Sequence, residues 1–443
     1  MASIKKRGEN SYLITVSCGY DSSGKKIFRT TTYRPELVTA KGNLKTESAI
    51  LKDVNAYAAD FEKQILTGHY TEGQNLTFEK YSQKYLSEYA RISQAPKTLQ
   101  STESAIKQFN AAFGYMTLAS LSPLFLQQYV NSMLNTKKKT GKAGTLSQGT
   151  VKRRAAVLSA MLSQAVRWNI LERNPMDNVQ IKRAATKEEK IQCFTQEQAE
   201  TFLSILDKPL LYEYSTRSRR DSSGKICNVQ EYQASRSINL QLKLFFYLAI
   251  FTGCRRGELI ALTWPDLDFE NNTVNICKSV CRVKGENIIK TPKNPKTCRV
   301  MAIPAVVINV AKLWKREQAA YRLSIGTQWI GDNHLFIQWN GALMSLDTPY
   351  QAFHRIINNH NAQQEDENKK LPLIPLHGLR HTAATLLIGQ HVNIRTVSDR
   401  LGHANVSTTL NFYSHAIKEL DRSASDELEK LLLPKSEQFR KQS

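Results

Sequence analysis

The sequence lacks any apolar run long enough to cross a membrane, which takes about 18 or more residues. The longest candidate, LKLFFYLAIFTGC, is interrupted by Lys243 and is predicted to be a buried helix. The N-terminal stretch MASIKKRGENSY has a basic start but no apolar stretch behind it, so it does not resemble a secretion signal. We therefore expect a cytoplasmic protein with no membrane partner.

Cysteine spacing typical of disulfides or metal sites is also missing. The seven cysteines are odd in number and scattered, without CxxC pairs, which indicates reduced thiols. CKSVC at 277–281 has no second pair of ligands, and the HxxxH of His377 and His381 lacks the glutamate of a metalloprotease motif. The sequence therefore predicts no metal site.

Acidic residues are few. Asp and Glu number 39 against 61 Lys and Arg, which gives a net charge of +22. This positive charge is larger than solubility alone requires, and it indicates a polyanionic partner. Nucleic acid is the first candidate and an anionic membrane surface the second.

The length of 443 residues predicts about three domains. In the first, residues 1–72, alternating YLITVSCGY and IFRTTTY flank the turn DSSGKK and predict a β-hairpin, and residues 44–68 predict a helix. The cations Lys25, Lys26 and Arg29 lie on this hairpin, which suits a DNA groove; the alternative is a solvated surface hairpin.

Residues 76–180 are predicted to form a second domain of four helices, closed by NPM at 174–176. The loop between its third and fourth helices and the start of the fourth helix are strongly basic. We expect phosphate contacts rather than ion-paired surface from Lys137, Lys138, Lys139, Lys152, Arg153 and Arg154.

Residues 181–191 read as a linker, and a Thr-capped helix after it begins a third domain, residues 192–434. Residues 208–236 are interpreted as a polar, irregular insertion between two helices, with Arg217, Arg219 and Arg220 as further DNA or subunit contacts. Residues 435–443 are expected to be a disordered tail. The predicted fold class is multidomain α+β: a small sheet with a helix, a helical domain, and a mostly helical domain with a small antiparallel sheet.

Three motifs in the third domain carry chemistry: TGCRRGELIALTW at 252–264, HGLRHTAATLL at 377–387 and LGHANVSTTLNFYSH at 401–415. In this order they resemble the signature of the tyrosine recombinases, or lambda-integrase family. The resemblance covers residues 77–420, and the N-terminal hairpin is similar to the arm-site binding domain of phage and conjugative-transposon integrases. The family implies a SAM-like helical domain at 76–180.

Position by position, the resemblance implies Arg255, His377, Arg380, His403 and the nucleophile Tyr413 as catalytic residues. Glu258 would orient Arg255, and His415 completes the Tyr-x-His ending as a supporting residue. The family also has a lysine in a β turn between the first two motifs. KTPKNPKTCRV offers Lys290, Lys293 and Lys296, of which we choose Lys293, with Lys296 second.

These residue types suit phosphodiester chemistry. Attack by an oxygen nucleophile adds charge to the non-bridging phosphate oxygens, which preorganised cations stabilise. Arginines offer planar bidentate donors, histidines add hydrogen bonds and move protons, and a lysine can protonate the leaving 5′-oxygen. A tyrosine with a reference pKa near 10 needs a proton acceptor or a cationic site. Ser407, Thr408 and Thr409 are interpreted as helix caps.

The resemblance implies an integrase of a mobile element that forms a 3′-phosphotyrosine without a cofactor. Its partners would be double-stranded DNA at core and arm sites, three further subunits in a tetramer on DNA, an excisionase and a host DNA-bending protein, in the bacterial nucleoid. The amphipathic tail after Tyr413 could close its own protomer or dock on a neighbour. Alternatives are a Xer-type resolvase, a type IB topoisomerase and a non-catalytic DNA-binding regulator.

Overall fold

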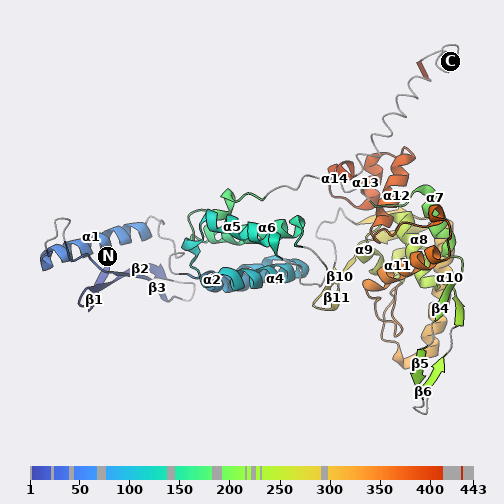
Figure 1. Ribbon diagram of the computed structural model, residues 1–443, viewed down its shortest axis with the longest axis horizontal. Coiled ribbons are helices and arrows are strands. Elements are labelled where there is room, and N and C mark those ends of the chain that lie inside the picture. Colours follow the sequence, from blue (N-terminus) through green and yellow to red (C-terminus); the bar gives the residue numbers. More distant parts are fainter. Residues whose placement is uncertain are drawn as a thin grey trace. The chain divides into compact units, whose positions relative to one another are not determined.

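The structure is a computed structural model, and it divides into two units, Met1–Lys187 and Glu188–Ser443 (Figure 1). It describes residues 2–20, 24–38, 44–66, 76–136, 145–181, 192–214, 217–220, 226–229, 232–290, 298–412 and 431–432. Within these ranges it gives the backbone alone at residues 64, 212–214, 217–220, 226–229, 232–233 and 411–412. Two predicted segments lie outside the described residues: the linker at 181–191, apart from residue 181, and the tail at 435–443.

The first unit begins with a three-stranded antiparallel sheet and one helix that covers a face of it (Figure 1). Alternation in the middle strand buries Tyr12, Ile14 and Val16, and the last two share a core with Ala58 and Phe61 of the helix. The predicted hairpin and helix are confirmed, and the structure adds an edge strand before them. The elements are β1 (Ser3–Gly8), β2 (Ser11–Tyr20), β3 (Lys26–Tyr33) and α1 (Glu47–Leu66).

The predicted four-helix domain is also confirmed. Its core is aromatic: Phe78, Phe109 and Phe113 are fully buried and lie in edge-on or stacked contact, each burial worth about 1.5–3 kcal/mol. Ser122 and Ser147 cap two of the helices by accepting from backbone N–H groups. The elements are α2 (Phe78–Tyr85), the π-helical η2 (Leu86–Ala90), α3 (Arg91–Ser93), α4 (Pro96–Phe113), η3 (Leu118–Ser120), α5 (Pro123–Asn135), α6 (Gln148–Arg167) and η4 (Pro175–Asn178).

The second unit starts at α7 (Gln196–Ile205), where Thr195 and Gln198 form a capping box, so the predicted Thr cap is confirmed. The expectation of an irregular insertion at 208–236 is wrong. Two antiparallel ladders form there, β4 with β7 and β5 with β6, and the second projects from the helices in Figure 1. The strands are β4 (Leu210–Tyr214), β5 (Arg217–Arg220), β6 (Ile226–Val229) and β7 (Tyr232–Arg236).

A buried helix, α8 (Leu240–Thr252), forms the centre of the second unit, as its nearly continuous apolar sequence predicts. Around it lie the other helices and two small antiparallel sheets, with strand orders β12-β9-β8 and β10-β11. The helical elements are α9 (Arg256–Ile260), η5 (Trp264–Asp266), α10 (Ala305–Ile325), η7 (Gly326–Gln328), α11 (Asp347–Ala362), η8 (Glu367–Lys369), α12 (Gly378–Gly389), α13 (Ile394–Leu401) and α14 (Val406–Phe412). The strands are β8 (Leu267–Asp268), β9 (Thr273–Ile276), β10 (Ser279–Val283), β11 (Glu286–Lys290) and β12 (Arg299–Ala302).

The predicted multidomain α+β class is confirmed by these elements. None of the helices in the described ranges combines the length and apolar character that crossing a membrane requires.

Candidate active site

Arg255 stands at the turn between α8 and α9. Gly253 ends α8 in the left-handed conformation, with φ of 64°, and its amide donates to the Ala249 carbonyl. A Cβ built there would lie 2.7 Å from the Leu401 side chain, so only glycine fits both the backbone and the packing. The tight turn aims Arg255 out of the buried helix as the N-cap residue of α9.

Glu258 fixes Arg255, as the sequence predicts. The carboxylate accepts from the Arg255 backbone N–H at 2.9 Å and from Arg255 Nη1 at 2.8 Å. Its other contact is Arg299 of β12, whose Nη2 donates to Glu258 Oε2 at 2.9 Å. Burial alone would raise the pKa of Glu258, but the Arg299 charge and the bonds from Arg255 outweigh it, so the pKa is lowered.

The role of Arg299 was missed by reasoning from the sequence. Its side chain is only 10% exposed, and its Nε donates to the Arg400 carbonyl at 2.8 Å. The Nη2 group also lies 3.3 Å from Cys254 Sγ. Arg299 therefore joins β12, α13 and α9 behind Arg255. In the sequence, only its position directly after the basic segment KNPKTC points to such a role.

The second arginine, Arg380, comes from α12 and is 3% exposed. Its Nη1 donates to the Gly253 carbonyl at 2.9 Å, directly before the turn that carries Arg255. The bond joins the HGLRH and TGCR motifs, so the two arginines meet although they are far apart in sequence.

His377 is the N-cap residue of α12, one turn before His381, and the two rings meet edge to face with centroids 5.0 Å apart. Although His377 keeps contact with solvent, crowding by protein atoms lowers its pKa to about 4, with further lowering by His381, Arg380 and Arg255. Burial and Arg380 also lower the pKa of His381. Both rings are therefore neutral near pH 7.

His403 follows Gly402, which ends α13 with φ of 69°. Its Nδ1 lies 2.8 Å from the hydroxyl of Thr409, a buried residue within α14. The interpretation of Thr409 as a helix cap is wrong, because Asn405 accepts from the Ser407 amide at the helix start. In the tautomer whose Nδ1 accepts from the Thr409 hydroxyl, Nε2 carries the proton and can donate a hydrogen bond to a ligand.

The pKa of His403 is also lowered to about 4. Burial is the main cause, followed by the charges of Arg380, Arg255 and Arg299 and by the His377 ring. The Arg380–Gly253 bond joins α12 to the turn of Arg255, and the charges that act on His377 and His403 agree with one neighbourhood for the four predicted residues.

A cavity of about 370 Å³ opens beside this cluster. His377, Arg380, Arg256 and Tyr350 line it together with apolar side chains. The Arg256 guanidinium lies 4.0 Å from Asp347 Oδ1, and its side chain is 39% exposed. The cavity joins a positive wall to an apolar one, which suits an anion attached to a larger group.

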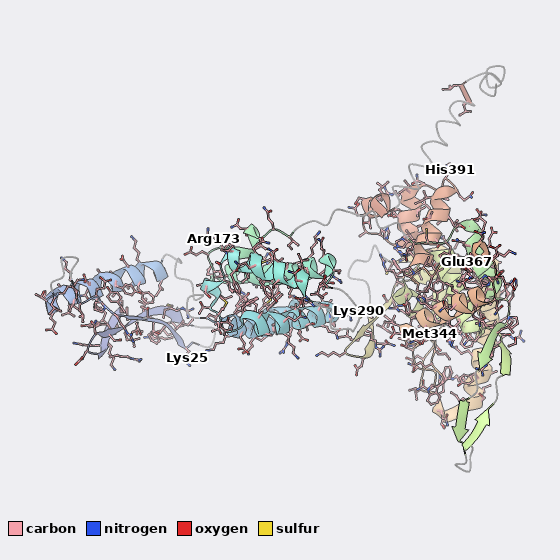
Figure 2. The ribbon with its side chains drawn as sticks, in the orientation of Figure 1. Lys25, Arg173, Lys290, Met344, Glu367 and His391 are labelled. Carbon is pink, nitrogen blue, oxygen red and sulfur yellow. The ribbon has the colours of Figure 1, made fainter. Side chains whose placement is uncertain are left out.

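Several predicted residues lie outside the described residues: the catalytic candidates Lys293, with Lys296, and Tyr413, the supporting His415, the loop cations Lys137, Lys138 and Lys139, and the tail after Tyr413. The structure does describe a residue near each of two of these candidates. Helix α14 ends at Phe412, next to Tyr413 in sequence, and β11 ends at Lys290, which Figure 2 labels.

The predicted DNA contacts of the N-terminal sheet divide between its faces. Pairing of Val16 with Arg29 puts Arg29 on the side covered by α1, whereas Lys26 lies on the open side with Phe28. Lys5 pairs with Leu13 and joins this open face. Figure 2 labels Lys25, which is exposed just before β3.

On α6, Lys152 and Arg153 are exposed, and Arg154 is partly buried. Arg153 donates back to the Gly149 carbonyl at 3.2 Å, so the guanidinium stays on the first turn of α6. Burial raises the pKa of Tyr129, and the nearby positive charge of Arg154 offsets part of this rise. Successive residues of a helix point about 100° apart, so the three cations surround the first turns of α6 instead of sharing one face.

The cluster can bind a tetrahedral oxyanion and stabilise added charge on it. Two guanidiniums supply bidentate donors, and two neutral imidazoles supply single N–H donors or accept protons. Among the described residues, no group of three or more His, Cys, Asp or Glu side chains could hold a metal ion.

Comparison with known proteins agrees with this arrangement. A model of the phage integrase family matches residues 221–419, and a model of the phage integrase N-terminal SAM-like domain matches residues 77–134. A XerC-like tyrosine recombinase of Caldanaerobacter subterraneus subsp. tengcongensis is 26% identical over 442 residues, 97% of this chain and 98% of its own. The ICEBs1 integrase of Bacillus subtilis (strain 168) is 25% identical, covering 97% and 100%. The Tn1549 transposon integrase in complex with transposon right end DNA shares the fold, with a TM-score of 0.59, 22% identity and coverage of 81% and 100%.

Proposed function

The chain belongs to the phage integrase family of tyrosine recombinases, and from this premise we propose that it cuts and rejoins DNA at specific sites to integrate and excise a mobile element. The observation that carries the proposal is the bond from Arg380 to the Gly253 carbonyl, which brings the HGLRH motif to the turn of Arg255 beside a cavity lined by His377 and Arg380. This cluster has the charge and donors that a phosphodiester in the act of cleavage requires.

In the proposed reaction, the Tyr413 phenol oxygen attacks the phosphorus in line with the 5′-oxygen. Arg255 and Arg380 hold the non-bridging oxygens, and His403 donates its Nε2–H to one of them. The neutral ring of His377 is in the form that can accept the phenol proton, because its pKa is lowered to about 4 in the protein alone. A bound phosphate raises that pKa toward neutrality, since negative charge favours the imidazolium.

Lys293 gives its proton to the leaving 5′-oxygen, and a 3′-phosphotyrosine and a free 5′-hydroxyl result. The phosphodiester energy remains in the new linkage. The 5′-hydroxyl of a second strand can therefore attack the phosphotyrosine and release Tyr413, which completes strand exchange without a nucleotide or a metal.

The division of labour follows the three domains. Residues 1–72 bind arm-site DNA through the open sheet face, while residues 76–180 and 192–434 bind the core site from two sides. Four subunits assemble on the paired sites, and an excisionase and a host DNA-bending protein set the direction. The net charge of +22 supports extended contact with DNA backbone.

A nicked suicide substrate tests the nucleophile. After cleavage next to the nick, the short strand diffuses away and the protein stays covalently attached, which a denaturing gel detects. We expect the wild type and Tyr115→Phe to trap DNA, since Tyr115 is an exposed residue of the helical domain. Tyr413→Phe should bind the same DNA without trapping it, and covalent capture by this variant would refute the assignment.

A plasmid assay separates the proposal from its alternatives. Exchange between paired attachment sites supports an integrase, and relaxation alone indicates a topoisomerase. Resolution of directly repeated identical sites without arm sites indicates a Xer-type resolvase, and binding without any change of the plasmid indicates a regulator.

A further inference from the structure

Two cysteines face each other across the ladder of β9 and β12. The last pair of this antiparallel ladder is Ile276 with Arg299, so Cys277 and Cys298 are the next residues on either strand. Cys298 helps to raise the pKa of the Cys277 thiol, as a close neighbour does. The two side chains are therefore direct cross-strand neighbours.

The pair lies on the outer side of the ladder. Arg299 and the buried Ile276 face the interior, and side chains alternate along a strand, so Cys277 and Cys298 face the other way. Cys277 Sγ donates to Asn275 Oδ1 at 3.3 Å on that side, and Cys298 is exposed. A small molecule in solution can reach the pair.

Cross-strand spacing is compatible with a disulfide. Residues directly opposite each other in an antiparallel ladder have Cα atoms about 4.5–5.5 Å apart. Disulfides span Cα distances of about 4.4–6.8 Å. Closing the bond therefore requires rotation of the two side chains and little movement of the strands.

A bond between Cys277 and Cys298 would lie next to residues that the proposed reaction uses. Between Lys290, the end of β11, and Cys298 the sequence holds both candidate lysines, Lys293 and Lys296. The next residue, Arg299, holds the Glu258 carboxylate that orients Arg255. Cys298 is thus attached on one side to the lysine segment and on the other to the support of the first arginine.

We propose that Cys277 and Cys298 form a reversible intramolecular disulfide by exchange with a small-molecule disulfide, and that the bond slows strand cleavage. The Cys298 thiolate attacks one sulfur of the oxidant, forms a mixed disulfide and releases one small thiol. The Cys277 thiolate then attacks Cys298 Sγ and expels the second thiol. The two protein thiols lose two protons and two electrons, and the oxidant is reduced to two thiols.

The order of attack follows from the surroundings of the two thiols. Burial, followed by Cys298 and Asp266, raises the pKa of Cys277 to about 11, so Cys277 is a poor first nucleophile. As the second nucleophile it attacks within the same molecule, where its proximity offsets a small thiolate fraction. The bond then fixes Cys298 to β9 and restricts both the lysine segment and Arg299.

The test uses the full chain, reduced with a thiol or oxidised with oxidised glutathione at pH 8 in the presence of a chelator. Mass spectrometry of the intact protein and of its peptides locates the bond. We expect a Cys277–Cys298 cross-link and trapping of the suicide substrate about tenfold slower, since small misplacement of catalytic groups has effects of this size. Reduction should restore the rate.

Three variants serve as controls. Cys298→Ser should trap DNA at the reduced wild-type rate under both conditions, whereas Cys281→Ser should respond as the wild type does. Cys277→Ser keeps the first nucleophile and should stop at the mixed disulfide of Cys298 with glutathione, which the intact mass reports. Absence of the cross-link, or a cross-link with unchanged trapping, overturns the inference. The effect on cleavage rests on the proposed function, and reduced wild type that traps no DNA would refute that function while the mass measurement still tests the bond.

Discussion

At the scale of single residues, the site depends on one buried carboxylate between two guanidiniums. Glu258 contacts both Arg255 and Arg299, and each guanidinium satisfies part of its charge. Removing one member of such a network leaves the others buried without compensation. Through its bond to Glu258, Arg299 holds the partner of Arg255.

Replacing Arg299 with lysine tests this positioning role. A lysine keeps the charge but cannot bridge the Arg400 carbonyl, Cys254 and Glu258 together. We expect covalent trapping to slow by about 10- to 100-fold, and unfolding free energy to fall by about 1–3 kcal/mol. DNA affinity should stay near the wild-type value.

Arg282→Lys is the matched control, because Arg282 forms an exposed pair with Asp347. Exposed pairs contribute about 0–1 kcal/mol, so this variant should behave as wild type. Equal losses of DNA affinity and of trapping rate in Arg299→Lys would show that the residue binds DNA instead of positioning Glu258.

The histidines predict how stability depends on pH. The pKa values of His377 and His403 are lowered to about 4 in the folded protein, while an unfolded histidine has a pKa near 6.5. Between these values the unfolded chain binds more protons, so stability is full above about pH 6.5 and falls as the pH drops toward 4. Glu258, whose pKa is lowered in the folded protein, adds a further loss of stability at the acid end of this range, because the unfolded chain protonates it first.

Urea unfolding at pH 7.5 and pH 5 measures this loss. His403→Gln, which can keep a bond to Thr409 but cannot titrate, should lose less stability than the wild type over the same interval. His360→Gln on α11, outside the cluster, should lose as much as the wild type does. Equal losses in all three proteins would contradict the assignment to His403.

Sequence motifs identified four residues of the cluster because their order along the chain is specific. Arg299 and Thr409 were out of reach, since their roles depend on contacts with residues 41 and 6 positions away, respectively. A threonine in the stretch NVSTTL reads as a helix cap by composition alone. Only the fold shows that its hydroxyl faces a histidine.

At the scale of elements, the end of α8 decides how the two arginines meet. Gly253 has φ of 64°, its Cβ position is filled by Leu401, and its carbonyl binds Arg380. Gly253 therefore ends α8, leaves room for Leu401 of α13, and accepts the hydrogen bond from Arg380.

Gly253→Ala should show all of these roles. The left-handed conformation and the contact with Leu401 together cost about 1–3 kcal/mol of unfolding free energy. Trapping should slow as well, because the Gly253 carbonyl moves with the turn. Gly389→Ala is the control: a Cβ at this end of α12 meets nothing within 4 Å, so a gain of about 0.5–1 kcal/mol is expected.

The strands show where patterns of sequence fail. The hairpin of β2 and β3 alternates apolar and polar residues against α1 and was predicted on that basis. In contrast, β5 is RSRR and β1 is SIKKRG, with no alternation to detect. Such strands form by pairing with a neighbour, which a single strand's sequence does not reveal.

At the scale of the whole molecule, the charge of +22 should act through separate DNA contacts. The open sheet face carries Lys5 and Lys26. We expect a Lys5→Ala, Lys26→Ala double variant to bind arm-site DNA more weakly and to lower the slope of log affinity against log salt by about 2. Core-site binding should not change.

Lys52→Ala, an exposed position on α1, is the control for this measurement and should keep the wild-type slope. Fluorescence anisotropy at several salt concentrations gives the slopes for both kinds of DNA. A double variant that loses core-site affinity equally would place the sheet on the crossover sequence.

The contact between α9 and β10 joins the helix that follows Arg255 to the β10–β11 hairpin, which ends at Lys290. A Cβ at Gly257 would lie 2.4 Å from the Val280 carbonyl, so the helix and the strand touch backbone to backbone. The Ser279 hydroxyl lies 2.9 Å from the same Cβ position, so the contact leaves no free space there. A displacement of the β10–β11 hairpin should therefore shift the helix that follows Arg255, and with it the bond between Arg255 and Glu258.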